Sequence, residues 1–330
     1  MFHKVLSRIQ KWPGLFLFHY RRLRFRVKHG KIRILDPLCY LESFHWMQLA
    51  KYHQYEAKDV VFDRLPASRV TSELPSISIV TPSYNHAPYL EETIRSVLDQ
   101  NYPKLTYAVV DGGSADGSAQ IIERYKDNLS FSVSEPDKGQ SDAIVKGMAR
   151  LSGEVQAYLN SDDFLAPGVL EYVGSYFAEH PEVDAVYGHR IIVDGNTREI
   201  GRWILPPHYA ESTKHFDYIP QETMFWRRSI AEKAGGIDPA FHFAMDWDFI
   251  LRLQASGARF RRLPYFLACF RAHEAQKSQA GSERGKREID ALMKRTGGDL
   301  DLGRDYETAH WKFRKKAFLT SVLLSLGIRR

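Results

Sequence analysis

The first half of the chain alternates short apolar runs with longer segments in which apolar residues recur every three or four positions. Runs rich in β-branched residues indicate strands, and these cover 77–81, 105–110, 131–134 and 154–159. Helical spacing covers 89–100, 117–126, 141–151 and a segment that begins at Pro167. Strands and helices that alternate in this order build a parallel sheet covered by helices. The pattern therefore predicts an α/β fold.

The alternation ends after residue 180. Two strands, 183–193 and 197–204, flank a short polar turn at 194–196 that is favourable for a hairpin. The remaining expected elements are short helices and one or two strands, which cover 229–234, 246–256, 258–272 and a charged helical region beyond 280. The second half is therefore expected to differ in topology from the first.

Charge is distributed unevenly along the 330 residues. Residues 1–33 hold ten Lys or Arg and no acid, and residues 311–330 hold six and no acid. The part between them holds 30 basic and 40 acidic residues, a net charge of −10. We therefore expect three regions, which are a basic peripheral arm, a globular domain and a helical region with a basic amphipathic tail, over 1–70, 71–280 and 281–330.

Both basic termini interleave Lys and Arg with aromatic and aliphatic residues. This combination suits an anionic membrane surface, where each basic side chain contributes ~1 kcal/mol near the headgroups. Neither apolar run approaches the roughly 20 residues needed to cross a bilayer, and no cleavage site follows the first run. We expect a cytoplasmic protein that is peripheral on the inner face of the cell membrane. The alternative is that the terminal helices pack on the domain.

Composition disfavours a nucleic-acid partner and a disulfide scaffold. A nucleic-acid reader usually carries its basic groups on the folded domain, which is acidic here, so we expect no nucleic-acid partner. Cys39 and Cys269 belong to no metal-binding spacing and fit a reducing compartment.

The first two strands end in small polar residues. Pro82, Ser83 and Tyr84 close the first strand, and Asp111 closes the second before Gly112-Gly113. Carboxyl ends of parallel strands meet at one edge of a sheet, where nucleotides bind. A carboxylate at the end of the second strand can accept hydrogen bonds from a base or ribose. The alternative is a structural role, in which Asp111 only caps its turn.

Two further acidic turns follow. In the loop 134–143, Asp137 and Lys138 come just before a predicted helix. Lys138 and the start of this helix would face a diphosphate, and Asp137 a ribose. The alternative is that the loop only caps the helix. Asp162 and Asp163 come directly after an apolar strand and repel each other unless a cation compensates. Such hard oxygen ligands suit Mg²⁺ or Mn²⁺ bridging nucleotide phosphates.

These motifs, in this order, resemble family 2 glycosyltransferases of the GT-A fold, over about residues 75–280. The strand-ending PSYN and DGGSADG segments, the EPDKGQSDA loop and the NSDD turn all match. The resemblance implies that Pro82, Ser83, Tyr84 and Asp111 bind the nucleotide, and that Asp162 and Asp163 form the metal site. Asn160 departs from the aspartate of many relatives, which implies a weaker charge at that site.

The second half resembles the acceptor side of the same family. Asp246 matches the aspartate expected to take the proton of the acceptor hydroxyl, although Met245 replaces the usual glutamate before it. Asp246 also suits the N-cap of its own helix. Gln221 and Trp226 are expected at the sugar pocket, and His273 matches a histidine that approaches the metal or diphosphate.

Taken together, the resemblance implies a metal-dependent, inverting transfer of a sugar from a nucleotide-diphosphate donor to a hydroxyl. The basic arms favour a glycan or lipid-linked acceptor in surface polysaccharide or lipopolysaccharide biosynthesis. Two alternatives remain open. A nucleotidyltransferase would share the sheet and the metal carboxylates, but the loop after its first strand would be glycine-rich and basic. A non-catalytic membrane or nucleic-acid adaptor would explain the arms but not the acidic strand ends.

Overall fold

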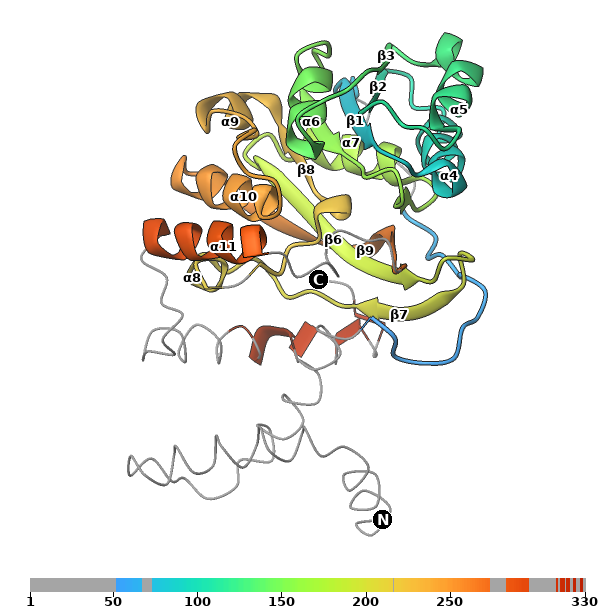
Figure 1. Ribbon diagram of the computed structural model, residues 1–330. Helices are drawn as coiled ribbons and strands as arrows, with labels where there is room; N and C mark the ends of the chain where they lie inside the picture. The colour runs from blue at the N-terminus through green and yellow to red at the C-terminus, as the bar shows by residue number, and fades with distance from the viewer. Residues whose placement is uncertain are drawn as a thin grey trace, which may run out of the picture. The chain divides into compact units, whose positions relative to one another are not determined.

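The computed structural model describes residues 52–66, 73–215, 217–273 and 283–296, with scattered positions between 313 and 328. Its centre is a nine-stranded sheet in the order β3-β2-β1-β4-β8-β6-β9-β5, with β7 paired to β6 (Figure 1). The strands are β1 (Ile77–Ser83), β2 (Leu105–Asp111), β3 (Phe131–Ser134), β4 (Val155–Tyr158), β5 (Phe164–Leu165), β6 (Ala185–Val193), β7 (Glu199–Trp203), β8 (Phe225–Arg227) and β9 (Phe260–Arg271).

Helices and 3-10 turns connect these strands. Those described are α4 (Ala87–Leu98), α5 (Ser118–Arg124), η1 (Lys126–Asn128), α6 (Gln140–Met148), α7 (Val169–Glu179), α8 (Ala210–Thr213), η2 (Gln221–Thr223), α9 (Arg228–Lys233), α10 (Met245–Ala255) and α11 (Glu283–Thr296). The predicted α/β fold is confirmed, with element ends that differ from expectation by a few residues. The helix expected at Pro167 begins at Val169, because Gly168 takes a left-handed conformation at its N-cap.

Strand direction divides the sheet into two parts. β1 pairs in parallel with β2 and β4, and β2 pairs in parallel with β3. β8 runs antiparallel to both β4 and β6, while β6 and β9 are parallel partners. The two short strands β5 and β8 have no strong alternation of their own, and the sequence did not predict them. The strand region expected within 258–272 is the single strand β9.

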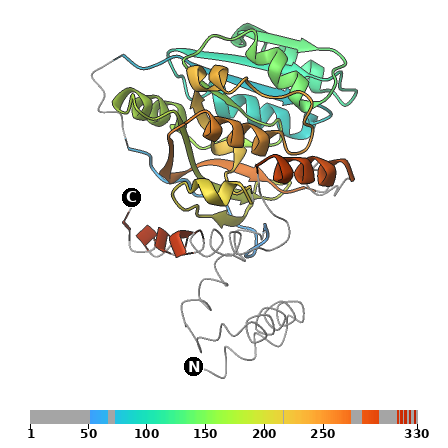
Figure 2. The same ribbon diagram turned by 90° about the vertical axis from the view of Figure 1, so that its left-hand side faces the viewer.

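Helices cover both faces of the sheet because strand residues alternate between them. Ile77 and Ile79 of β1 pack with α4, α5 and α7, whereas Val80 packs with α6, α9 and α10. α9, α10 and α11 are stacked along one side in Figure 1 and face the viewer in Figure 2. The ends of β1 to β4 therefore lie between two helical layers.

Close packing of α6 on β1 depends on Gly147. A Cβ atom at this position would lie 2.5 Å from Cγ1 of Val80. Because α6 begins directly after the acidic loop 134–139, this contact sets how near that loop approaches the end of the first strand.

The helix that carries Asp246 is held by α11. The carboxylate of Glu288 accepts the backbone N–H groups of His242, Phe243 and Ala244, which end the loop before α10. No side chain of α10 itself makes this cap, so the interpretation of Asp246 as the N-cap of its own helix is wrong. Glu288 instead fixes the loop that enters α10, so the C-terminal region helps to position this helix.

Part of the expected peripheral arm packs on the domain. The backbone N–H of Gln54 donates to the carbonyl of Ile200 at 2.7 Å, and Lys58 pairs with Glu199 on the outer side of β7. The ring of Tyr52 stacks on Trp203. The boundary placed at residue 70 stays a prediction, as does the membrane role of residues 1–33 and most of 311–330, which lie outside the described residues. Within the described part of the chain, no helix combines the length and the apolar character that a bilayer span requires.

Candidate active site

Three strand ends meet at one edge of the sheet. Ser83 of β1 is level with Asp111 of β2, which is level with Ser134 of β3. Asp111 is fully buried, and its carboxylate accepts the N–H and hydroxyl of Ser114 and the hydroxyl of Ser134. These bonds hold the turn after β2 closed. The nucleotide-binding role of Asp111 stays a prediction, and its present contacts favour the capping interpretation.

The residues around Asp111 differ in exposure. Tyr84 is 63% exposed, and the buried hydroxyl of Ser83 has no hydrogen-bond partner among the described residues. Asp137 lies against the backbone of Gly112, where an added Cβ would be 2.9 Å from its Oδ2. Lys138 is exposed beside it, directly before α6. Pro82 is buried and serves the strand rather than the surface.

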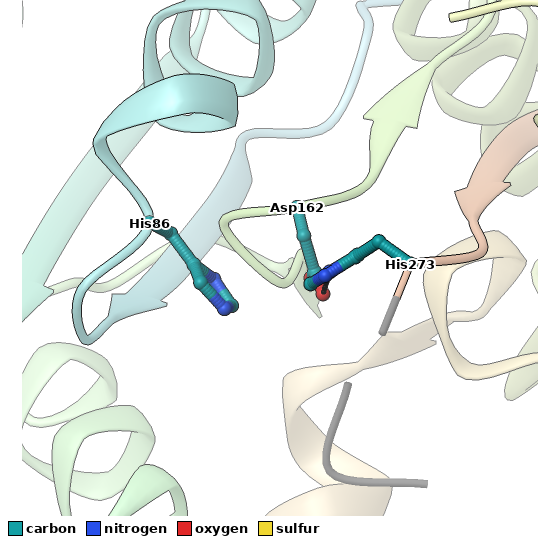
Figure 3. Close-up of side chains that lie close together, drawn as sticks. All are labelled: His86, Asp162 and His273. Carbon is teal, nitrogen blue, oxygen red and sulfur yellow. Dashed lines mark hydrogen bonds and ion pairs between the residues drawn. The ribbon is translucent and has the colours of Figure 1, made fainter. Parts of the chain in front are cut away.

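A group of metal-ligand type lies where β4, β9 and α4 approach one another. Nε2 of His273 is 3.1 Å from Oδ2 of Asp162, and Nδ1 of His86 is 2.7 Å from Oγ of Ser161. His86, Asp162 and His273 each place one ligand atom within 4.8 Å of the others, and Figure 3 shows the three side chains pointing toward a common centre. His86 carries no sequence pattern beyond its place before α4, so the sequence did not predict it.

Asp163 lies behind this group instead of within it. It is 1% exposed, and its Oδ1 accepts the backbone N–H of Arg271 at 3.0 Å. Burial and the neighbouring carboxylates of Asp162 and Glu222 raise the pKa of Asp163 well above its ordinary value. The carboxyl of Asp163 is therefore turned into the protein, whereas that of Asp162 faces the two imidazoles.

Arg271 fixes the acidic turn to its surroundings. Its side chain is buried, and it donates to the carbonyl of Asp162, to the hydroxyl of Thr197 and to the carboxylate of Glu92. On the other side of the turn, the hydroxyl of Thr93 reaches the carbonyl oxygens of Ser161 and Asp163. The loop that carries Asp162 is thus held from β9, from the hairpin and from α4.

Hydrogen bonds between three amide side chains connect α6 with η2. Gln140 donates to Asn160, Asn160 donates to Gln221 at 3.2 Å, and Gln221 donates to the carbonyl of Tyr158 at 2.6 Å. Asn160, the departure from aspartate, therefore joins α6 to η2 through its two amide ends. This network places Gln221 at the site, although its role toward a sugar stays a prediction.

Trp226 lies elsewhere. Its indole is 2% exposed, packs on Phe249 and donates to Gln156 from within the core. This position offers no surface to a donor or acceptor, so the expected place at the sugar pocket is corrected to a structural one. In the sequence, Trp226 stands two residues before the start of a helix. That position does not distinguish a side chain of a sugar pocket from one of the core.

The first turn of α10 carries the acidic residue Asp246. Asp246 is half-buried, and its Oδ1 accepts the N–H of Trp247. Burial, followed by the carboxylate of Asp246, raises the pKa of Asp217 in the loop between α8 and η2. Asp248, two residues on, is buried and paired with Arg252 and Arg295, so its role is structural.

A buried ion pair joins β6 to η2. Glu222 of η2 accepts two hydrogen bonds of 2.6 Å from the guanidinium of Arg190, which lies between the rings of Trp203 and Phe270. A bidentate pair of this kind fixes both partners in one geometry. Both carboxylate oxygens of Glu222 are therefore held by Arg190, and this buried pair is structural.

The family profile described as "Glycosyl transferase family 2" matches residues 78–235. An uncharacterized glycosyltransferase of Mycobacterium tuberculosis strain H37Rv is 30% identical over 184 residues, which are 54% of this chain and 68% of the relative. This chain belongs to glycosyltransferase family 2. A second uncharacterized glycosyltransferase, from a Nostoc species, is 26% identical over 75% of this chain and 88% of its own length.

Solved structures agree with the fold. The mannosyltransferase PcManGT from Pyrobaculum calidifontis, solved with GDP-Man and Mn²⁺, has a TM-score of 0.55 and 20% identity over 87% of this chain and 82% of its own. S. aureus TarS, solved with UDP-GlcNAc, has a TM-score of 0.54 and 18% identity over 74% of this chain and 75% of its own. The family 2 chain described here is a glycosyltransferase with the GT-A fold that its motifs predicted.

Proposed function

We propose that this glycosyltransferase is inverting and metal-dependent, and that it moves a sugar from a nucleotide-diphosphate donor to a hydroxyl of a glycan or lipid-linked acceptor. The observation that carries the proposal is the convergence of His86, Asp162 and His273 from three distant segments. They meet beside the strand ends that bear Ser83 and Asp111, where a sugar nucleotide would place its diphosphate.

The donor atoms support a divalent ion. Two imidazole nitrogens and one carboxylate oxygen suit Mn²⁺ better than Mg²⁺, because Mg²⁺ prefers oxygen ligands alone. We revise the predicted ligand set accordingly, with His86 in the place expected for Asp163. Asp163 supports the turn through its bond from Arg271. When bound, the ion supplies Lewis-acid stabilisation of the charge on the leaving diphosphate.

The rest of the donor site follows from exposure and charge. Tyr84 offers an exposed ring for stacking against a base, and the unpartnered hydroxyl of Ser83 offers a hydrogen bond. Lys138 and the start of α6 favour a diphosphate nearby, while Asp137 is placed for a ribose hydroxyl. Asp111 supports this site by closing its turn, and we keep direct contact with the base as a proposal.

Asp246 is the proposed base. Inversion requires one displacement in which the acceptor oxygen attacks the anomeric carbon as the diphosphate leaves. The half-buried carboxylate of Asp246 takes the acceptor proton in that step. Gln221 lies between the donor side and the acceptor side, where it accepts a hydrogen bond from Asn160 and donates one to the carbonyl of Tyr158. The lipid-linked acceptor and the place at the inner membrane face rest on the basic composition of the two termini.

The test is metal-dependent turnover of a panel of UDP-, GDP- and dTDP-sugars, with donor binding measured separately. Asp246→Asn is expected to bind the donor but to stop transfer, and Asp162→Ala is expected to weaken donor binding. Asp163→Ala is also expected to weaken donor binding, by loosening the turn. Unchanged transfer by Asp246→Asn would contradict the role of Asp246 as the base. Equal donor affinity with and without metal would contradict the proposed metal dependence. Inversion is read from the anomeric configuration of the product by NMR.

The membrane part has its own test. A chain without residues 1–33 is expected to leave vesicles of anionic lipid that the full chain binds. Retention by a chain that lacks both basic termini would refute the anchoring proposal.

A further inference from the structure

The first two turns of α4 contact the turn that carries Asp162. His86, Tyr89 and Thr93 are three and four positions apart, a spacing that places them on one face of the helix. Nδ1 of His86 is 2.7 Å from Oγ of Ser161, and the hydroxyl of Thr93 donates to the carbonyl of Ser161 at 3.0 Å. Tyr89 lies between these two contacts along the helix. No step of the proposed reaction uses Tyr89.

The ring of Tyr89 packs on both proposed imidazole ligands. Its centroid lies 4.9 Å from that of His273 and 6.4 Å from that of His86. The two imidazoles are themselves 5.8 Å apart and nearly perpendicular, with an angle of 82° between their planes. All three separations fall within the range of about 4.5–7 Å in which aromatic rings attract one another. The three rings therefore form one cluster, and the position of Tyr89 limits where the two ligands can lie.

Arg271 supports the ring of Tyr89. The guanidinium carbon lies 4.7 Å from the centroid of the ring, which makes a cation–π contact. The side chain of Arg271 is 1% exposed, and it donates to the hydroxyl of Thr197 and to the carboxylate of Glu92. Because Arg271 is fixed in this way, the ring that packs on it has little freedom to move.

His273 depends on such a neighbour for its orientation. Its Nε2 meets Oδ2 of Asp162 at 3.1 Å, and among the described residues this is the one hydrogen bond that the ring makes. Histidines that bind metals are usually oriented by a second hydrogen bond, made by the other ring nitrogen. The ring of Tyr89 packs on the imidazole of His273 in place of that bond.

We propose that Tyr89 is a positioning residue for the metal site. Its ring keeps the imidazole of His273 turned toward Asp162, in the orientation from which both groups bind the ion. An imidazole that is already oriented loses less conformational entropy when the ion binds, so the affinity for the ion is higher. The inference rests on the proposed metal dependence and deepens it. Tyr89 acts through His273 and does not bind the ion itself.

Titration of Mn²⁺ into the full chain, with UDP or GDP present and followed by electron paramagnetic resonance, tests this role. Tyr89→Leu is expected to weaken Mn²⁺ binding about ten-fold, because the support of one ligand is lost. Tyr89→Phe keeps the ring and removes only the hydroxyl, so it should bind Mn²⁺ as wild type does.

Tyr172→Leu is the matched control. Tyr172 of α7 is half-buried, as Tyr89 is, and its ring packs on that of Tyr265 with the centroids 5.1 Å apart. The change removes an aromatic contact of the same kind at a place that holds none of the proposed ligands. Tyr172→Leu should therefore bind Mn²⁺ as wild type does, even where both leucine variants unfold at a lower temperature.

A second measurement reads the position of His273 without any metal. The imidazole signals of histidine-labelled protein are recorded by NMR, and those of His273 are identified by their absence from His273→Ala. An aromatic ring with its centroid at 4.9 Å shifts the signals of its neighbour. Tyr89→Leu should therefore move the His273 signals, whereas Tyr89→Phe and Tyr172→Leu should leave them near their wild-type positions.

The outcomes separate this inference from the function on which it rests. Equal Mn²⁺ affinity in wild type and Tyr89→Leu, or unmoved His273 signals, overturns the role of Tyr89 and leaves the proposed metal site in place. An equal loss of affinity in Tyr89→Phe and Tyr89→Leu also overturns it, because the hydroxyl would then be responsible. No Mn²⁺ binding by wild type overturns the proposed metal dependence, and this inference with it.

Discussion

Nε2 of His273 lies 3.1 Å from Oδ2 of Asp162, across 111 residues of intervening chain. The contact joins the end of β9 to the turn after β4. A ring nitrogen of His86 lies near both atoms and completes a group of three possible metal ligands. An imidazole nitrogen and a carboxylate oxygen that meet in this way share a hydrogen bond, which an ion bound to both groups would replace with two metal–ligand bonds.

The first prediction concerns metal affinity. His273→Ala and His86→Ala are each expected to lower the affinity for Mn²⁺ by at least about ten-fold, because each removes one of three ligands. Titration of Mn²⁺ followed by electron paramagnetic resonance, in the presence of UDP or GDP, measures this directly. His53→Ala, at an exposed position, is the control. Equal Mn²⁺ affinity in all three variants would rule out the proposed ligand set.

A second prediction follows from Glu288. Burial alone would raise its pKa, but the N–H groups of Phe243, Ala244 and His242 outweigh burial and lower it. Glu288→Gln should therefore reduce the free energy of unfolding by about 1 kcal/mol near neutral pH. The ionised cap is fully effective above the ordinary glutamate pKa of ~4.3 and is lost as pH falls through the lower value of the folded state.

Urea denaturation at neutral pH and at about pH 4 tests this sign. The difference between wild type and Glu288→Gln should shrink toward acid. Glu123→Gln, which loses only an exposed pair with Lys126, should change stability by less than about 0.5 kcal/mol at either pH. A difference that grows in acid would contradict the capping role.

Arg271 gives a third prediction. Arg271→Lys keeps the charge but cannot reach Asp162, Thr197 and Glu92 together, so we expect a loss of about 2–4 kcal/mol in unfolding free energy. The metal affinity should fall with it, because the turn that carries Asp162 is loosened. Arg95→Lys, in an exposed pair with Asp99, is the comparison and should be nearly neutral. Wild-type stability in Arg271→Lys would refute the proposed network.

The fourth prediction tests the packing of α6. Gly147→Ala raises helix propensity by about 1 kcal/mol, but the new methyl group meets Val80, and overpacking costs about 1–3 kcal/mol. A net loss of stability is therefore expected. The double variant Gly147→Ala/Val80→Ala should recover part of it relative to the sum of the single changes, and denaturation of all four proteins measures this coupling. Strict additivity would show that the contact is relieved elsewhere.

The sequence predicted the elements that have a strong periodicity. The strand 131–134 coincides with β3, and 105–110 is extended by one residue at Asp111 in β2. β5 and β8 were not predicted, because two or three residues carry no period and these strands exist through pairing with β9, β4 and β6. These two strands therefore form because of pairing with strands that are distant in the sequence.

The site was predictable where chemistry follows a strand end in the chain. Asp162 and His273 were expected together and lie together. His86 was not predicted, because a single histidine before a helix has no pattern in the sequence. Trp226 shows the opposite error, since an aromatic beside a motif was assigned to the pocket although it fills the core. Sequence order does not tell which face of a short strand a side chain takes.

The pairing of residues 52–66 with β7 bears on how shortened forms of this protein should be designed. Glu199 and Ile200 receive their outer backbone bonds from Lys58 and Gln54, so removing that segment leaves the last strand beside β6 with unpaired N–H and C=O groups. An open strand of this kind recruits other chains and leads to aggregation. Expression variants that begin at Glu73, at the start of the motif-bearing region, should therefore precipitate, whereas those that begin ahead of Tyr52 should not.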